Sequence, residues 1–289
     1  MSFLFNSKKR QSKSSKGFNW ITLMSYLTLL FFALIIIVPL MIILFAAFKT
    51  PSQIATDFPL NPPSELYLKN IVTAFFDGKI PLGFKNSLII VIVSDFVNIL
   101  IGTTTAYAIG RFDFKLKKVI LGIFMLAMML PGNLTEIPRF IVMHKIGAYD
   151  TLIAPCIIYA STDVLQLYIY LQFLEKIPYS LDESAMLDGC SYFGIFRRII
   201  LPLMTPAIAT LTIIKTVWVM NDMFIPYLYM PSKSLRTLTT TLMDFSSSKF
   251  ATWNNLSAAI IIVTLPTVLL FIFLQKYIFA GIVAGSVKE

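Results

Sequence analysis

The feature that most constrains this chain is a series of long apolar segments. Each has at least about 20 residues, the length that an α-helix needs to cross roughly 30 Å of hydrocarbon. Only 13% of the residues are charged and 57% are hydrophobic. The sequence therefore predicts an all-α, polytopic membrane protein with six transmembrane helices, at about residues 20–48, 84–110, 117–138, 149–174, 199–229 and 254–276.

The distribution of basic residues predicts the orientation of these spans. We expect a membrane domain at 20–276, with a basic tail at 1–19 and a second tail at 277–289. An even number of spans places both tails on one side, which then carries 14 Lys and Arg residues, against 9 in the opposite loops. Because basic residues favour the cytoplasmic side, we expect both termini and the loop at 175–198 to be cytoplasmic, in a bacterial plasma or inner membrane.

The net charge of +9 does not indicate nucleic-acid binding. The basic residues lie in short blocks beside the apolar segments, and they form no basic face with interleaved aromatic residues. Such blocks suit anionic lipid headgroups. Membrane lipid is therefore an expected partner, and nucleic acid is not.

Residues 180–202 form a polar segment between the fourth and fifth predicted spans. Ser180 and Glu183 have the spacing of a capping box, which predicts a short helix. Gly189 predicts a left-handed stop, and Ser191 can cap a second short helix that leads into the fifth span. From these features alone, the segment is either a contact surface for another protein or a solvated connector.

The segment resembles the EAA loop of ABC importer permeases. The similarity lies in a set of spaced residues: Glu183, Ser184, Ala185, Gly189, Leu201 and Pro202. Ser184 stands where the family usually has alanine, which keeps that position small. In that family the loop is a coupling helix that docks in a cleft of a separate ATP-binding subunit. The resemblance therefore implies that this chain couples to an ATPase through residues 180–202.

The resemblance covers nearly the whole chain, and it indicates the carbohydrate-importer permeases of the maltose type. Further similar stretches are Asn86-Ser87-Leu88, Arg111-Phe112, Asn221-Asp222 and Gln275-Lys276-Tyr277. The resemblance implies the type I ABC importer fold and a subunit that forms half of the pathway for a sugar or oligosaccharide. It also implies a second homologous permease, an ATPase dimer that binds ATP and Mg, and an extracellular or periplasmic solute-binding protein.

Several polar residues fall inside the predicted spans. An ionisable group there costs about 2.5–3.5 kcal/mol, so it normally faces a cavity or a partner. We expect Asn98 and Gln166 to hydrogen-bond between helices. The candidates for the substrate pathway are Trp218, Asn221 and Asp222, with Trp218 alternatively a packing residue. Asp95, Asp163 and Lys215 also lie within spans, and an aspartate of another helix is a candidate partner for Lys215.

Two further segments have two interpretations each. The loop at 230–253, rich in Ser and Thr, either reaches toward the solute-binding protein, as the resemblance implies, or is a solvated connector. The tail from Gln275 either contacts the ATPase pair or is a frayed end.

The sequence has no pattern typical of a catalytic, nucleotide-binding or metal site. It lacks a phosphate-binding loop, a zincin pattern and a Ser-His-Asp arrangement, and His144 is its sole histidine. We therefore expect no catalytic residue, no metal site and no enzyme activity, with ATP hydrolysis left to a partner. The alternative function is a self-sufficient ion-coupled carrier or channel. An intramembrane enzyme lacks candidate residues.

Overall fold

The computed structural model describes residues 20–286, which fold into helices joined by short connections. Three helices are long and apolar enough to cross a membrane: α1 (Trp20–Phe48), α4 (Ile80–Arg111) and α15 (Trp253–Ser286). Three pairs of shorter helices join at bends, so the described residues have up to six spans. The first, second and sixth predicted spans are continuous, but the third, fourth and fifth are broken.

The third and fourth spans break where the chain cannot continue a helix. The first of these pairs separates at Pro131, which has no N–H to donate. The second separates before Asp163, whose Oδ1 accepts a hydrogen bond from the Gln166 N–H at 2.7 Å and so caps the next helix. Asp163 therefore lies at a helix end, and not inside a continuous span as the sequence predicted. The helices are α5 (Lys117–Met129), α6 (Gly132–Lys145), α7 (Ile153–Ala160) and α8 (Val164–Glu175).

The fifth span is also divided. A bend of 71° at Met204 separates its first part from its long second part, and the chain leaves the helix again at Asp222. The span predicted at 199–229 is therefore divided into several helices. The parts are α10 (Tyr192–Ile195), the π-helix η1 (Phe196–Ile200), α11 (Leu201–Leu203), α12 (Thr205–Asn221) and α13 (Phe224–Tyr229).

Short helices fill the connections between spans. They are α2 (Pro51–Thr56), α3 (Lys69–Asp77), α9 (Ser180–Leu187), the 3-10 helix η2 (Lys233–Leu235) and α14 (Leu238–Ser246). At the other end of the chain, α15 continues through residues 277–286, which the sequence assigned to a tail. The basic tail at 1–19 lies outside the described residues.

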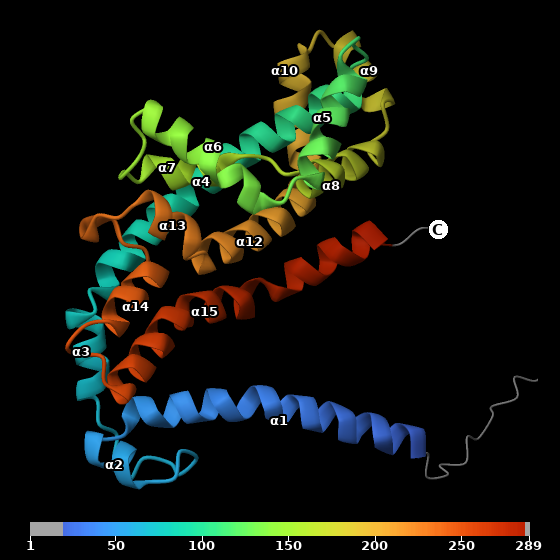
Figure 1. The fold of residues 1–289 in the computed structure, drawn as a ribbon. Coiled ribbons are helices and arrows are strands. Elements are labelled where there is room, and N and C mark those ends of the chain that lie inside the picture. The colour runs from blue at the N-terminus through green and yellow to red at the C-terminus, as the bar shows by residue number, and fades with distance from the viewer. Residues whose placement is uncertain (1–19, 287–289) are drawn as a thin grey trace, which may run out of the picture.

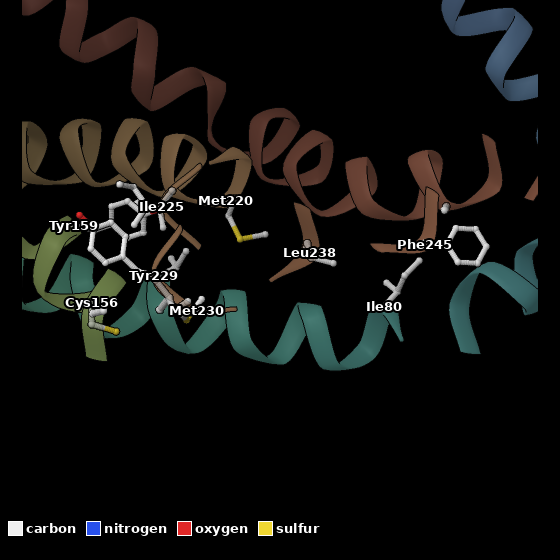
Figure 2. Close-up of a cluster of buried hydrophobic side chains, with 14 of the residues drawn as sticks. Ile80, Cys156, Tyr159, Met220, Ile225, Tyr229, Met230, Leu238 and Phe245 are labelled. Atoms are coloured by element: carbon white, nitrogen blue, oxygen red, sulfur yellow. The ribbon is translucent and has the colours of Figure 1, made fainter. Parts of the chain in front are cut away.

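Two apolar clusters form the interior, and α4 contributes to both. The first half of α4 supplies Ile80 and Ile90 to a cluster with α7, α13 and α14. Figure 2 shows part of this cluster, with Tyr229, Leu238 and Phe245 on the side of α4 that faces the other helices. The last turns of α4 supply Ala106 and Ile109 to a second cluster with α8, α9 and α10.

The arrangement of the helices separates the two ends of the molecule. Figure 1 shows α9 and α10 together at one end and α2 and α3 at the other, with α4 running between them. Nearly all of α1 remains exposed, including Phe31 and Ile36, which are more than 60% accessible. A polar segment thus lies at one tip of a predominantly apolar bundle.

Candidate functional site

The helix α9 begins one residue earlier than the capping-box pattern predicted. Tyr179 is its N-cap residue, and the Tyr179 carbonyl accepts hydrogen bonds from the N–H groups of Asp182 and Glu183 at 2.9 and 3.1 Å. Ser180 therefore lies inside the helix, where its own carbonyl accepts a hydrogen bond from the Ser184 hydroxyl. The prediction of a Ser180–Glu183 capping box was wrong, because the Glu183 N–H already has a backbone partner.

The end of α9 agrees with the sequence prediction. Gly189 has φ +82°, the left-handed conformation that glycine adopts without strain. The Gly189 N–H donates to the Met186 carbonyl at 3.0 Å, and the Cys190 N–H donates to the Ala185 carbonyl at 2.9 Å. These are the two hydrogen bonds of a Schellman motif. The turn therefore fixes the direction in which the chain leaves α9.

The next helix begins with a side-chain cap, as the sequence predicts. The Ser191 hydroxyl accepts a hydrogen bond from the Gly194 N–H at 3.2 Å. The helix then widens into the π-helix at Phe196–Ile200, which ends two residues before Pro202. Because proline has no N–H, a normal helical hydrogen bond is missing at this position. The two predicted motif residues here differ in accessibility: Leu201 is half-buried and Pro202 is exposed.

The motif residues of α9 divide between two faces. Glu183 and Ser184 are exposed, and Leu187 is 90% accessible. Ala185 instead points inward and belongs to the second apolar cluster, with Ile195. Its small side chain therefore permits close packing of α9 on the neighbouring helices, whereas the family resemblance placed it in a docking loop.

An ion pair connects α9 to the end of α4. The Arg111 Nε atom lies 3.0 Å from Asp182 Oδ2, and the two side chains are only 9% and 4% accessible. The Arg111 Nη2 group donates a hydrogen bond to the Ile177 carbonyl at 2.8 Å, and the Tyr179 ring lies 5.6 Å from the guanidinium carbon. No local pattern connects two residues so far apart in the chain.

The polar residues within the spans connect helices. The Asn98 amide group donates to the Ser161 carbonyl at 2.8 Å and to Gln166 Oε1 at 3.1 Å, which confirms the predicted interhelical role of this pair. Asp95 of α4 accepts a hydrogen bond of 2.5 Å from the Thr216 hydroxyl of α12. Lys215 differs from these residues, because its Nζ atom lies 5.6 Å from the centroid of the Trp218 ring in the same helix, α12.

The predicted pathway residues lie at the break after α12. Trp218 is 56% accessible and packs edge-on against Tyr159. Asn221 is exposed, and its amide group bonds to the Val217 carbonyl of its own helix. Asp222 Oδ1 accepts a hydrogen bond from the Phe224 N–H at 2.7 Å. Asp222 therefore holds the turn into α13, a role that the sequence did not predict.

The segment before α14 is fixed to the start of α4. The Asn86 amide group donates to the carbonyls of Ser234 and Arg236 at 3.0 and 2.9 Å. The Leu238 N–H donates to the Ser87 hydroxyl at 3.0 Å. Residues 234–238 are therefore firmly attached to a span.

A second set of contacts fixes the start of the same loop. The Ser232 N–H and hydroxyl donate to the Asp150 carboxylate at 3.0 and 2.5 Å. These hydrogen bonds stabilise the ionised form and hold the pKa of Asp150 below its ordinary value. The loop at 230–253 is thus tied to two other parts of the chain rather than freely solvated.

Comparison with known proteins gives this geometry a context. The family of binding-protein-dependent transport system inner membrane components matches residues 98–283. AmyC of Thermoanaerobacterium thermosulfurigenes, a probable permease for starch degradation products, is 33% identical over 260 residues, which are 89% of this chain and 93% of AmyC. AraQ of Halalkalibacterium halodurans, an arabinooligosaccharide permease, is 28% identical over 282 residues, which are 96% of this chain and 99% of AraQ.

The fold has a counterpart among solved structures. A chain of a bacterial ABC transporter involved in the import of the acidic polysaccharide alginate superposes with a TM-score of 0.80. The match covers 89% of this chain and 96% of that chain at 18% identity, so it shows the fold alone. Components of this kind work with a binding protein and a separate ATPase, and they are transport subunits rather than enzymes. The chain belongs to the family of binding-protein-dependent transport system inner membrane components, the multi-pass permease subunits of ABC importers.

Proposed function

We propose that this permease carries a sugar or an oligosaccharide and receives the force for transport through α9. The names of AmyC and AraQ support a carbohydrate substrate, because both relatives match nearly the full chain. The observation that carries the coupling role is the outward face of α9. Glu183, Ser184 and Leu187 project from the tip of the molecule, while the buried Ala185 and the turn at Gly189 hold the helix in place.

Each exposed group on α9 suits a docking surface. The Leu187 side chain offers an apolar contact at 90% accessibility, and Glu183 offers a charge partner beside it. Desolvated apolar anchors with nearby charges are the usual basis of specific protein interfaces. In this proposal Leu201 and Pro202 set the angle at which the docked segment enters the membrane. ATP and Mg bind to the ATPase subunits and not to this chain.

The sugar pathway passes the break between α12 and α13 in this proposal. Trp218 presents an exposed ring that Tyr159 holds in place, and such a ring can stack on the apolar face of a sugar. Asn221 is exposed one turn further along the same helix and can bond to hydroxyl groups. Asp222 keeps the break open through its bonds to α13.

The remaining partners fit other surfaces of the chain. A second, homologous permease and membrane lipid cover the exposed apolar side chains of α1 and α5. Both termini and α9 face the cytoplasm, and the loop at 230–253 faces the solute-binding protein outside. Residues after 275 approach the ATPase pair. This assembly replaces the alternative of a self-sufficient ion-coupled carrier, because family membership implies an external binding protein and an ATPase.

Exchange of Glu183 for lysine tests the docking surface. We expect Glu183→Lys to abolish copurification of the ATPase and nucleotide-dependent uptake, because it reverses the charge on the exposed face. Glu175→Lys is the matched control, since Glu175 is an exposed glutamate at the end of α8. ATPase binding and uptake at the normal level in Glu183→Lys would show that α9 is not the coupling site.

A second pair of variants tests the turn. Gly189→Val places a β-branched residue at φ +82°, which costs roughly 1–2 kcal/mol. Gly189→Asn is the control, because asparagine adopts this conformation more readily. We expect only the valine variant to lose coupling. Uptake of labelled maltotriose, arabinotriose and raffinose by the complete complex tests the substrate class, and uptake by this chain alone without nucleotide would contradict the whole proposal.

A further inference from the structure

The guanidinium group of Arg111 is surrounded by the segment that leads into α9. It contacts the Ile177 carbonyl, the Tyr179 ring and the Asp182 carboxylate, which lie within six consecutive residues. The Arg111 Nε atom and Asp182 Oδ2 are 3.0 Å apart in a nearly dry environment. Because a buried charge without its partner is strongly unfavourable, α9 and the end of α4 are held together as one unit.

The orientation of α9 matches this attachment. Asp182 and Ala185 are three residues apart, so they share one helix face, and both are buried. Glu183 and Ser184 occupy the other face and are exposed. A partner protein that displaces α9 through its exposed face therefore also displaces Arg111, which contacts the buried face.

The opposite end of α4 carries a second attachment. Asn86 bonds to two carbonyls, those of Ser234 and Arg236, and Ser87 bonds to the N–H of Leu238. Gly83 permits the backbone to approach closely, because a Cβ atom there would lie 3.0 Å from the Thr237 carbonyl oxygen. The segment at 234–238 is therefore fixed to the first turns of α4.

Between these attachments, α4 is unbroken. It has 32 residues, and its one proline lies in the first turn. At 1.5 Å per residue, Asn86 and Arg111 lie about 37 Å apart along it. The spans on either side of α9 are different: the α7–α8 span bends by 48°, and the α10–α12 span bends by 71°. Of the described spans that contact the α9 segment, α4 is the one that can act as a straight rod.

We propose that Arg111 clamps α9 to α4, so that α4 transmits displacement of α9 to the segment at 234–238 on the opposite side of the membrane. This proposal rests on the assignment of α9 as the ATPase-coupling helix. Arg111 is then a positioning residue: it touches neither nucleotide nor sugar, and it acts through α4. Force from the ATPase reaches the binding-protein side along one helix held at both ends.

The experiment follows the far end of α4 while the ATPase acts. In the complete complex, Cys156 and Cys190 are replaced by serine, and Lys233→Cys places a single exposed thiol beside the clamped segment. The rate of thiol labelling is measured with and without ATP and vanadate. We expect ATP and vanadate to change this rate by about fivefold in the parent protein, within the usual range of coupling between distant sites.

Variants at each attachment then decide the proposal. We expect Arg111→Gln, and the pair Asn86→Ala with Ser87→Ala, to remove the change in labelling while the ATPase still copurifies. The double variant Arg111→Asp with Asp182→Arg should restore the change in labelling rate, because the ion pair is rebuilt with its charges exchanged. Ser94→Ala is the matched control, since the Ser94 hydroxyl bonds to the Val91 carbonyl within α4 itself.

The outcomes separate this inference from the proposed coupling role. If the ATPase copurifies and Arg111→Gln responds like the parent protein, the clamp does not transmit and the inference is wrong. A parent complex that retains its ATPase but shows no response at position 233 also overturns it. If Arg111→Gln and the charge exchange both fail to assemble, the pair serves folding alone, which rejects the inference too. Loss of ATPase binding in Glu183→Lys, or its persistence, decides the coupling role separately.

Discussion

The hydroxyl group of Tyr159 in α7 donates a hydrogen bond of 2.9 Å to the Asp222 carboxylate, at the break between α12 and α13. Tyr159 is almost fully buried, with 1% accessibility. The same carboxylate caps the first turn of α13. A hydrogen bond therefore joins two spans at the point where the helix of one of them is interrupted, beside the exposed ring of Trp218.

Removal of the Tyr159 hydroxyl tests this connection. We expect Tyr159→Phe to lower the free energy of unfolding by about 2 kcal/mol, because a buried hydrogen bond to a charged group is lost. Thermal unfolding of the detergent-solubilised protein measures the change. Tyr227→Phe, at a half-exposed tyrosine of α13, is the control and should have little effect. Equal stability of the two variants would show that the bond to Asp222 contributes nothing.

The contact between α4 and α14 depends on the absence of a side chain at Gly83. A Cβ atom there would lie 2.7 Å from Thr241 Oγ1, which forces the helices apart. We expect Gly83→Ala to destabilise the protein by about 1 kcal/mol, since overpacking outweighs the gain in helix propensity. The matched control is Gly122→Ala in α5, where the added Cβ atom meets nothing within 4 Å. A Gly83→Ala protein as stable as Gly122→Ala would contradict the close contact.

The pair Asp150 and Ser232 predicts a pH dependence. The pKa of Asp150 is lowered in the folded protein, so its stabilising contribution is present above the ordinary pKa of aspartate and is lost as pH falls through the lowered value. We expect Ser232→Ala to reduce stability at neutral pH and to weaken this acid dependence. Unfolding temperatures of both proteins, measured from neutral to acidic pH, check this expected difference. Ser246→Ala, whose hydroxyl bonds to the Met243 carbonyl, is the control; an unchanged acid profile in Ser232→Ala would refute the linkage.

Much of the polar segment at 180–202 could be predicted from local sequence. Gly189 and Ser191 have the conformation and the cap that their residue types predict, because both depend on the nearest few residues. The start of α9 could not be predicted in this way. The Glu183 N–H donates to the Tyr179 carbonyl, so Ser180 and Glu183 form no capping box despite their spacing.

Less of the candidate site could be predicted from the sequence. The family resemblance placed Ala185 in a docking loop, but the residue packs inward, since the face that a short helix buries depends on the residues beneath it. Asp222 was predicted as a pathway residue, and its bonds to Tyr159 and α13 became visible only in the fold. The ion pair of Arg111 and Asp182 had no local signal at all.

By itself, the sequence determined the fold class, the number of spans, and the polar segment between the fourth and fifth of them. It could do so because hydrophobicity and length are local properties, and the thickness of the membrane sets their scale. Only the tertiary structure decided where the spans break and which polar groups meet. Tyr159 and Asp222 are 63 residues apart, and Asn86 and Arg236 are 150 apart, so these pairs exist only once the helices have packed.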